Sequence, residues 1–138
     1  AVRRLKLAST LQYTVYGTPS LFYGDEVGIE GGRDPFCRMP YPWGREDAEL
    51  LAHYRRLGEV RAGEQVFHGG DFEILGYGEG FIAYERRRGG ERVVVAANSG
   101  DAGLSFRLPG RQVDLLAGRE FCGRVALGPI SAVILKDI

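Results

Sequence analysis

Long apolar segments, an excess of charge of one sign and clustered cysteines are all missing from this sequence of 138 residues. No apolar run approaches the roughly 20 residues that are needed to span a bilayer. Lysine plus arginine and aspartate plus glutamate both number 18, and both signs are scattered, so no field of one sign attracts phosphate backbones or anionic lipids. We therefore expect no nucleic acid and no membrane as partners.

Groups of metal ligands are also missing. The two histidines, His53 and His68, have no cysteine or carboxylate around them at metal-ligand spacing. The two cysteines, Cys37 and Cys122, lie far apart, and their spacing does not indicate a disulfide. We expect no metal, no cofactor, and reduced thiols in a cytoplasmic protein.

The length and the start of the chain limit its organisation. The chain has room for one sizeable core, or for one modest domain with a short added unit, which excludes two full enzyme domains. The first residues, AVRRLKLAST, lack the apolar core and the cleavage site of a secretory signal. They enter an amphipathic pattern at once, without Met and without a capping residue, which suggests that a preceding segment is missing.

The first 62 residues have the pattern of an α/β unit. Between residues 2 and 16, apolar side chains recur at every third or fourth position, which predicts a helix whose buried stripe is Leu5, Ala8, Leu11 and Val15, with Leu7 beside it. The run SLFY at residues 20–23, bounded by Pro19 and Gly24, predicts a buried strand of a parallel sheet. A second helix is predicted over residues 46–61, with an inner face of Leu50, Leu51, Tyr54, Leu57 and Val60.

Beyond Gly63 the sequence changes to short β-rich segments separated by glycine-rich turns. These segments are QVFH, DFEILGY, GFIAYERR, RVVVAAN, LSFRL, VDLLA and ISAVILK. The stretch GFIAYERRRGGERVVVAAN predicts a hairpin that turns at Gly89 and Gly90. Spacing of this kind predicts an antiparallel sandwich with a core of its own.

A long loop, rich in glycine, proline and aromatic residues, joins the predicted strand to the second helix. In an α/β barrel, the loop after each strand lies on the face where ligands bind. Asp34 and Arg38 lie four apart with Pro35 between them, so an acceptor and a forked donor can converge on neighbouring sugar hydroxyls. Tyr41 and Trp43 offer flat faces for sugar rings. The spacing fits equally well an ion pair that only staples the loop, with Trp43 packed into the barrel wall.

The stretch GTPSLFYGDEVGIEGGRDPFCRMPYPW resembles the segment that runs through the eighth strand of the α-amylase superfamily, glycoside hydrolase family 13. The family pattern reads pGtPxxyYGdEiGm, then DPxxR, then a tryptophan. This sequence matches it at Gly17, Thr18, Pro19, Tyr23, Gly24, Asp25, Glu26, Gly28, Asp34, Pro35, Arg38 and Trp43. The helix ELLAHYRRLGEVR is similar to the eighth barrel helix, and GDFEIL, FIAYERR and VVVAAN are similar to the start of the C-terminal β domain.

Details of the loop point to a branch of that family. The Gly31-Gly32 run and Cys37 are similar to neopullulanases and cyclomaltodextrinases. Residues 40–42, Pro-Tyr-Pro, depart from the Pro-Met that the family often has before its tryptophan. This departure affects the shape of the loop and leaves Asp34 and Arg38 in place.

The resemblance implies a fold class of α/β plus all-β. Residues 1–62 would form the end of a (β/α)8 catalytic barrel (helix 7, strand 8, loop and helix 8), and residues 63–138 a C-terminal antiparallel β-sandwich. Asp34 and Arg38 would bind hydroxyls of a glucose unit on the non-reducing side of the scissile bond, with Trp43 as a further binding candidate. Tyr23 and Glu26 would hold the end of the strand.

The resemblance also implies that the catalytic residues lie outside this chain. The nucleophile, the acid/base and the second aspartate of the family follow strands four, five and seven, which would all precede residue 1. Asp25 and Glu26 form a tempting pair, since glycosidases use two carboxyl groups roughly 5 to 9.5 Å apart. However, neighbours on an extended strand point to opposite faces.

We therefore expect a C-terminal fragment of a retaining α-glucan hydrolase or transferase, inactive alone, which self-associates through exposed barrel surface. Its glucan would be starch, a maltooligosaccharide, pullulan or a cyclodextrin. The alternative is a non-catalytic carbohydrate-binding or interaction module with an amylase-like sequence. That module would need exposed aromatic residues in the β half, where the candidates are Tyr77, Phe81, Tyr84, Phe106 and Phe121.

Overall fold

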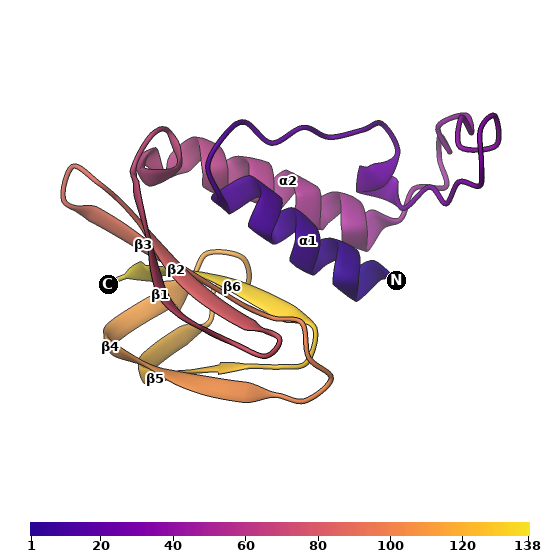
Figure 1. Ribbon diagram of the computed structural model, residues 1–138. Coiled ribbons are helices and arrows are strands. Elements are labelled where there is room, and N and C mark those ends of the chain that lie inside the picture. Colours follow the sequence, from indigo (N-terminus) through magenta and orange to yellow (C-terminus); the bar gives the residue numbers. More distant parts are fainter.

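In a computed structural model of all 138 residues, two helices lie side by side across one face of an antiparallel sheet (Figure 1). The helices are α1 (Val2–Thr14) and α2 (Ala48–Gly63), and two short 3₁₀ turns are η1 (Asp25–Val27) and η2 (Gln65–Phe67). The strands are β1 (Asp71–Gly78), β2 (Phe81–Arg88), β3 (Glu91–Asn98), β4 (Leu104–Asp114), β5 (Glu120–Leu127) and β6 (Ser131–Asp137). Neither helix is long and apolar enough to cross a membrane.

Helix α2 agrees with its prediction. It begins after Asp47, whose side chain accepts a hydrogen bond from the backbone N–H of Leu50 at 2.9 Å and thereby caps the helix. Its buried residues recur at helical spacing, so one face packs against the rest of the chain: Leu50, Tyr54, Leu57 and Val60. The predicted apolar face is confirmed, except that Leu51 is only half-buried.

Helix α1 turns a different face inward from the one predicted. Its buried residues are Ser9, Thr10 and Thr14, whereas Ala8 is exposed. The hydroxyls can be buried because they donate to backbone carbonyls one turn earlier, at 2.7 Å from Thr10 to Lys6 and 2.7 Å from Thr14 to Thr10. The predicted stripe is therefore wrong at Ala8, although its later members do pack against the core.

The predicted strand at residues 20–23 does not form. This segment is irregular, and Leu21, Phe22 and Tyr23 are exposed, with Phe22 at 63%. A strand requires neighbours that satisfy its backbone groups, and none of the six strands pairs with this segment. The prediction of a buried strand is wrong for this chain, and the barrel part of the fold class is not confirmed.

The β half forms one continuous sheet in the order β1-β2-β3-β6-β4-β5, with every pair antiparallel. The hairpin between β2 and β3 turns at Gly89 and Gly90, which have φ of 58° and 86°, so this prediction is confirmed. The segment QVFH is mostly the 3₁₀ turn η2, VDLLA only completes β4, and β5 was missed. Every second residue of β5 is exposed, but Cys122 and Ala126 are apolar residues on that exposed face, so the alternation is blurred in the sequence.

The sheet folds over on itself and so acquires two cores. Strand β4 pairs with β6 only over residues 112–114, and the β4–β5 hairpin crosses below the other strands (Figure 1). One cluster lies towards the helices: Leu57, Val60, Val66, Phe67, Tyr84, Val93, Val95 and Ile134. The other lies between the two parts of the sheet: Ala83, Val94, Ala96, Leu108, Val125, Leu127, Val133 and Leu135.

The first cluster joins the two parts that the sequence analysis divided at residues 62 and 63. Leu57 and Val60 of α2 pack with Val93 and Val95 of β3. Successive residues of β3 enter opposite clusters, because side chains alternate across a strand. Burial on both faces explains the continuous apolar run VVVAA. The division into two domains stays a prediction.

Candidate functional site

The loop that precedes α2 extends away from the rest of the molecule (Figure 1). Every residue from 31 to 40 is exposed. The segment contains the two residues that the sequence analysis predicted to bind sugar hydroxyls. Because no other part of the chain covers it, its side chains are available to a ligand.

Asp34 and Arg38 meet in this loop. Nε of Arg38 lies 2.8 Å from Oδ1 of Asp34, and both side chains are well exposed, at 73% and 63%. A turn places them there, since the N–H of Arg38 donates to the carbonyl of Pro35 at 3.0 Å. Oδ2 of Asp34 and both terminal nitrogens of Arg38 make no hydrogen bond. The pair therefore retains a free acceptor beside free donors.

Tyr41 and Trp43 form a second pair of side chains at the far end of the loop. Their ring centroids lie 4.5 Å apart at an angle of 47°, and Trp43 is 81% exposed. Partial burial, followed by the charges of Glu26 and Glu46, raises the pKa of Tyr41. No hydrogen bond or ring contact joins this pair to Asp34 or Arg38. The predicted binding residues thus form two separate groups.

Tyr23 and Glu26 make contacts within the backbone framework of the loop. The hydroxyl of Tyr23 donates to the carbonyl of Met39 at 3.0 Å, which ties the start of the loop to its far side. Glu26 accepts a hydrogen bond from the N–H of Gly24 at 2.8 Å. Gly24 needs its φ of 94°, and a Cβ there would lie 2.5 Å from Ile29 Cδ1. Asp25 and Glu26 lie in η1 and not on a strand.

Two features of the loop were missed by sequence reasoning. Phe36 is 71% exposed between Asp34 and Arg38, and the thiol of Cys37 lies 3.8 Å from Oδ1 of Asp34. An apolar residue inside a charged turn was the available signal for Phe36. The thiol contact depends on the turn geometry, which the sequence does not reveal. Cys37 and Cys122 are both free and exposed.

The aromatic residues of the β half show mostly core packing. Tyr77 is 82% exposed and Tyr84 is 1% exposed. Phe81, Phe106 and Phe121 are partly buried and pack against the second cluster. A separate binding module in this half would therefore present one fully exposed ring.

No family model matches the chain, but individual proteins do. It is 47% identical over 88 residues to an amylopullulanase of Thermoanaerobacter thermohydrosulfuricus, an alignment that covers 63% of this chain and 6% of that protein. It is 36% identical over 109 residues to a cyclomaltodextrinase of a Bacillus species, covering 76% of this chain and 20% of that protein.

Solved structures agree with these relatives. An Anoxybacillus α-amylase superimposes with a TM-score of 0.89 at 30% identity, over 99% of this chain and 33% of that one. The α-amylase of Geobacillus thermoleovorans, solved in complex with acarbose, gives a TM-score of 0.90 at 25% identity, over 98% of this chain and 33% of that one.

This chain belongs to the α-amylase superfamily. It corresponds to the C-terminal region of these enzymes, on the neopullulanase and cyclomaltodextrinase-like branch, as the loop residues predicted. The chain spans 6% and 20% of the two curated relatives. Membership of the α-amylase superfamily also accounts for the loop before α2, whose residues carry the family pattern.

Proposed function

We propose that this chain is the C-terminal part of a retaining α-glucan hydrolase or transferase and that its loop forms one side of the glucan-binding site. Asp34 and Arg38 bind neighbouring hydroxyls of one glucose unit, and Trp43 packs against a sugar ring. Tyr23 and Glu26 hold the loop in position. The names of the relatives, amylopullulanase and cyclomaltodextrinase, support an α-glucan as the substrate class.

One observation carries the proposal. The Asp34–Arg38 ion pair is exposed, and a surface pair of this kind contributes little to stability, about 0 to 1 kcal/mol. Its free oxygen and free nitrogens can accept from one hydroxyl and donate to the next, which matches the alternating donors and acceptors of a sugar. Binding explains this arrangement better than a contribution to folding does.

The catalytic carboxylates of the proposed enzyme come from residues outside this chain. Glu26 already accepts a hydrogen bond from the N–H of Gly24, only two residues away. Asp25 and Glu26 are neighbours in a short turn, so they are poorly arranged to act on opposite sides of one glycosidic bond. We expect the purified chain to hydrolyse neither starch, pullulan nor cyclodextrin. Turnover that the Glu26→Gln substitution abolishes would contradict this assignment.

Trp43 allows a direct test of glucan binding, because it is the single tryptophan of the chain. Titration of the full chain with maltoheptaose should change its fluorescence in a saturable way. The dissociation constant should be on the order of millimolar, since only one side of a site is present. Asp34→Asn and Arg38→Gln should each weaken binding.

The matched control is another exposed ion pair of the chain. Arg111 and Glu120 lie 2.9 Å apart on β4 and β5, far from the loop in sequence, so Arg111→Gln should leave the titration unchanged. If maltoheptaose does not alter the fluorescence, the loop does not bind glucan. Calorimetry detects binding that leaves the fluorescence unchanged. If calorimetry shows equal binding to the unmodified chain and to the Asp34→Asn variant, the β half is the binding module instead.

The proposal includes self-association of the chain. Several large apolar side chains around the loop lie at the surface, and contiguous apolar patches promote association. These residues are Leu21, Phe22, Tyr23, Phe36, Met39 and Trp43. In the proposed enzyme, barrel units outside this chain cover part of this surface.

A further inference from the structure

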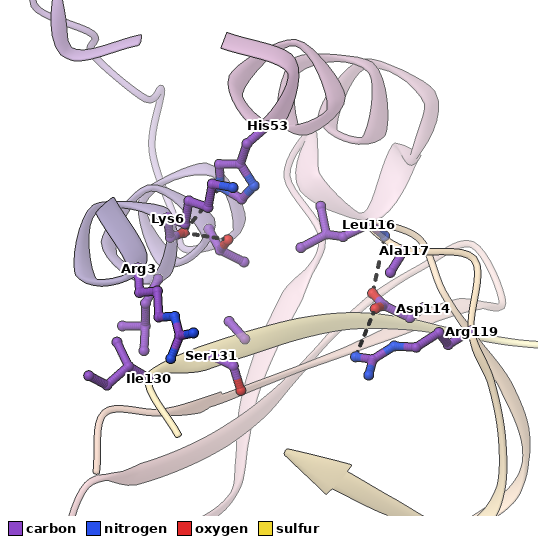
Figure 2. Close-up of a pocket in the computed structure, with 12 residues that line it drawn as sticks. Arg3, Lys6, His53, Asp114, Leu116, Ala117, Arg119, Ile130 and Ser131 are labelled. Atoms are coloured by element: carbon purple, nitrogen blue, oxygen red, sulfur yellow. Dashed lines mark hydrogen bonds and ion pairs between the residues drawn. The ribbon is translucent and has the colours of Figure 1, made fainter. Parts of the chain in front are cut away.

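A cavity of about 300 Å³ lies between the helices and the sheet, and it shares no residue with the loop before α2. Figure 2 shows its walls. Arg3 and Lys6 reach it from α1, and Arg119 reaches it from the segment between β4 and β5. Ile130 lines it from the turn between β5 and β6, and Ser131 from the start of β6. Elements far apart in the sequence therefore meet around one space.

The charges that line this cavity are mostly positive. Three cationic side chains face one carboxylate, that of Asp114. Asp114 is buried, and its Oδ1 already accepts hydrogen bonds from the N–H groups of Leu116 and Ile134, while Arg119 lies 3.6 Å from Oδ2. Both oxygens of the single carboxylate thus already have partners within the chain, so Asp114 neutralises little of the charge on the other cations.

Arg3 is the cation without a partner. Lys6 pairs with Glu49 at 2.5 Å, and Arg119 pairs with Asp114, but Arg3 makes no ion pair and no side-chain hydrogen bond. Burial, with the nearby charge of Lys6, lowers the pKa of His53, although a backbone hydrogen bond opposes this shift. A lowered pKa favours the neutral form of His53, so the unpaired positive charge of the cavity lies on Arg3.

The turn at the edge of the cavity is strained. Ile130 has a φ of 46°, which is uncommon for any residue except glycine and is an outlier for a β-branched one. Its N–H donates to the carbonyl of Gly100 at 3.1 Å, and this contact holds the turn in place. Strained residues of this kind cluster at ligand sites, where the surrounding structure over-determines them.

The lining favours an anion over a neutral sugar. No phenylalanine, tyrosine or tryptophan lines the cavity, so a sugar ring would find no flat apolar face there. Arginine forks, in contrast, match the geometry of phosphate and carboxylate oxygens. The volume exceeds that of a single water, about 30 Å³, by a wide margin, so an anionic group with a small attached body can enter.

We propose that this cavity binds the phosphate group of inorganic phosphate or of a sugar phosphate, held between Arg3 of α1 and Arg119 beside β5. Such a ligand joins the helices to the sheet by bonds that the chain alone does not make. The site is separate from the loop before α2, with which it shares no residue, so we assign it an effector role.

Thermal unfolding of the full chain tests this site. Sodium phosphate, compared with sodium chloride at equal ionic strength, should raise Tm by about 5 °C at ten times the dissociation constant. The same measurement of Tm is made with glucose 6-phosphate and with glucose. A rise with both phosphates shows that the free ion is sufficient, and a rise with glucose 6-phosphate alone identifies a sugar phosphate. No rise above chloride with either phosphate overturns the proposal.

Two variants and one direct measurement complete the test. Arg3→Gln, which breaks no contact within the chain, should lose most of the rise in Tm. Arg124→Gln, on β5 and outside the cavity, should keep it. In an NMR titration of the unmodified chain with phosphate, amide signals of residues 116–119 and 130–132 should move, and those of residues 74–77 of β1 should not. A full rise in the Arg3→Gln variant, or unmoved signals at residues 116–119 and 130–132, would exclude the site.

Discussion

The hydroxyl of Tyr84 lies 2.6 Å from Oγ1 of Thr14, and this contact joins the end of α1 to the middle of the sheet. Both side chains are buried. Burial raises the pKa of Tyr84 to about 12, although the hydrogen bond to Thr14 and the charge of Arg86 oppose the rise. The two groups thus form one neutral hydrogen bond inside the core, between residues that lie 70 positions apart.

Tyr84→Phe should destabilise the chain by about 1 to 2 kcal/mol. The substitution keeps the ring but removes the donor, and a buried group that loses its partner incurs a desolvation cost of this size. Urea unfolding followed by circular dichroism measures the change. Tyr77→Phe, at a ring that is 82% exposed, is the control and should change little. If a double-mutant cycle with Thr14→Val gives no coupling energy, the hydrogen bond does not contribute.

Arg86→Met should cost more, about 2 to 4 kcal/mol. The buried guanidinium of Arg86 donates to the carbonyls of Thr14 at 2.8 Å, Gly70 at 3.1 Å and Asp71 at 3.2 Å. Methionine keeps an apolar stem of similar length and leaves all three carbonyls without that donor. Urea denaturation curves should show the lower free energy of unfolding. Arg107→Met, at an exposed arginine, should leave the free energy of unfolding nearly unchanged. Equal effects of the two substitutions would contradict this role.

Stability should fall in acid partly through Glu85. Burial alone would raise the pKa of this carboxyl, but hydrogen bonds and charges of Arg87 and Arg92 outweigh burial and lower the pKa below 4.5. The folded state stabilises the charged carboxylate more than the unfolded state does. The contribution of Glu85 to the free energy of unfolding is therefore fully present above pH 4.5. It is lost as the pH falls through the lowered pKa.

The free energy of unfolding, measured by urea titration from pH 7 to pH 3, should therefore fall less steeply below pH 4.5 in Glu85→Gln than in the unmodified chain. Glu79→Gln provides the control, because Glu79 is exposed and makes no ion pair. Its pH dependence should match that of the unmodified chain. A Glu85→Gln profile parallel to that of the unmodified chain would show that Glu85 does not titrate in this window.

Self-association should depend on the exposed side chains near the loop. Light scattering over a range of concentrations should show a rising mass for the unmodified chain. Phe22→Ser should shift the rise to higher concentration, because Phe22 is 63% exposed and its ring lies beside that of Tyr23, at a centroid distance of 4.9 Å and an angle of 46°. Ile74→Ser, at an exposed residue of β1, should leave the association unchanged. A monomer at every concentration would refute the prediction.

Local patterns allowed several parts of the fold to be predicted from sequence. The spacing of apolar residues in α2 and the Gly89-Gly90 turn depend on neighbours a few positions away. The Asp34–Arg38 pair belongs to the same class, since both residues lie in one turn. In each case the residues that contact one another lie close together in the sequence, so a local periodicity or a short motif reports the contact.

Other features depended on contacts between distant segments, and no local pattern reports these. The segment 20–23 has the composition of a buried strand, yet it has no neighbour to pair with and stays irregular. Arginine usually lies at the surface, yet Arg86 is buried. Its guanidinium can be buried because it donates to carbonyls of two other segments of the chain. Hydrogen-bond partners supplied from elsewhere in the chain decide whether a backbone becomes a strand and whether a polar group can be buried. The α-amylase motif was therefore readable from the residues, whereas the buried hydroxyls of α1, the fold of the sheet and the arginine-lined cavity emerged only when the chain was assembled.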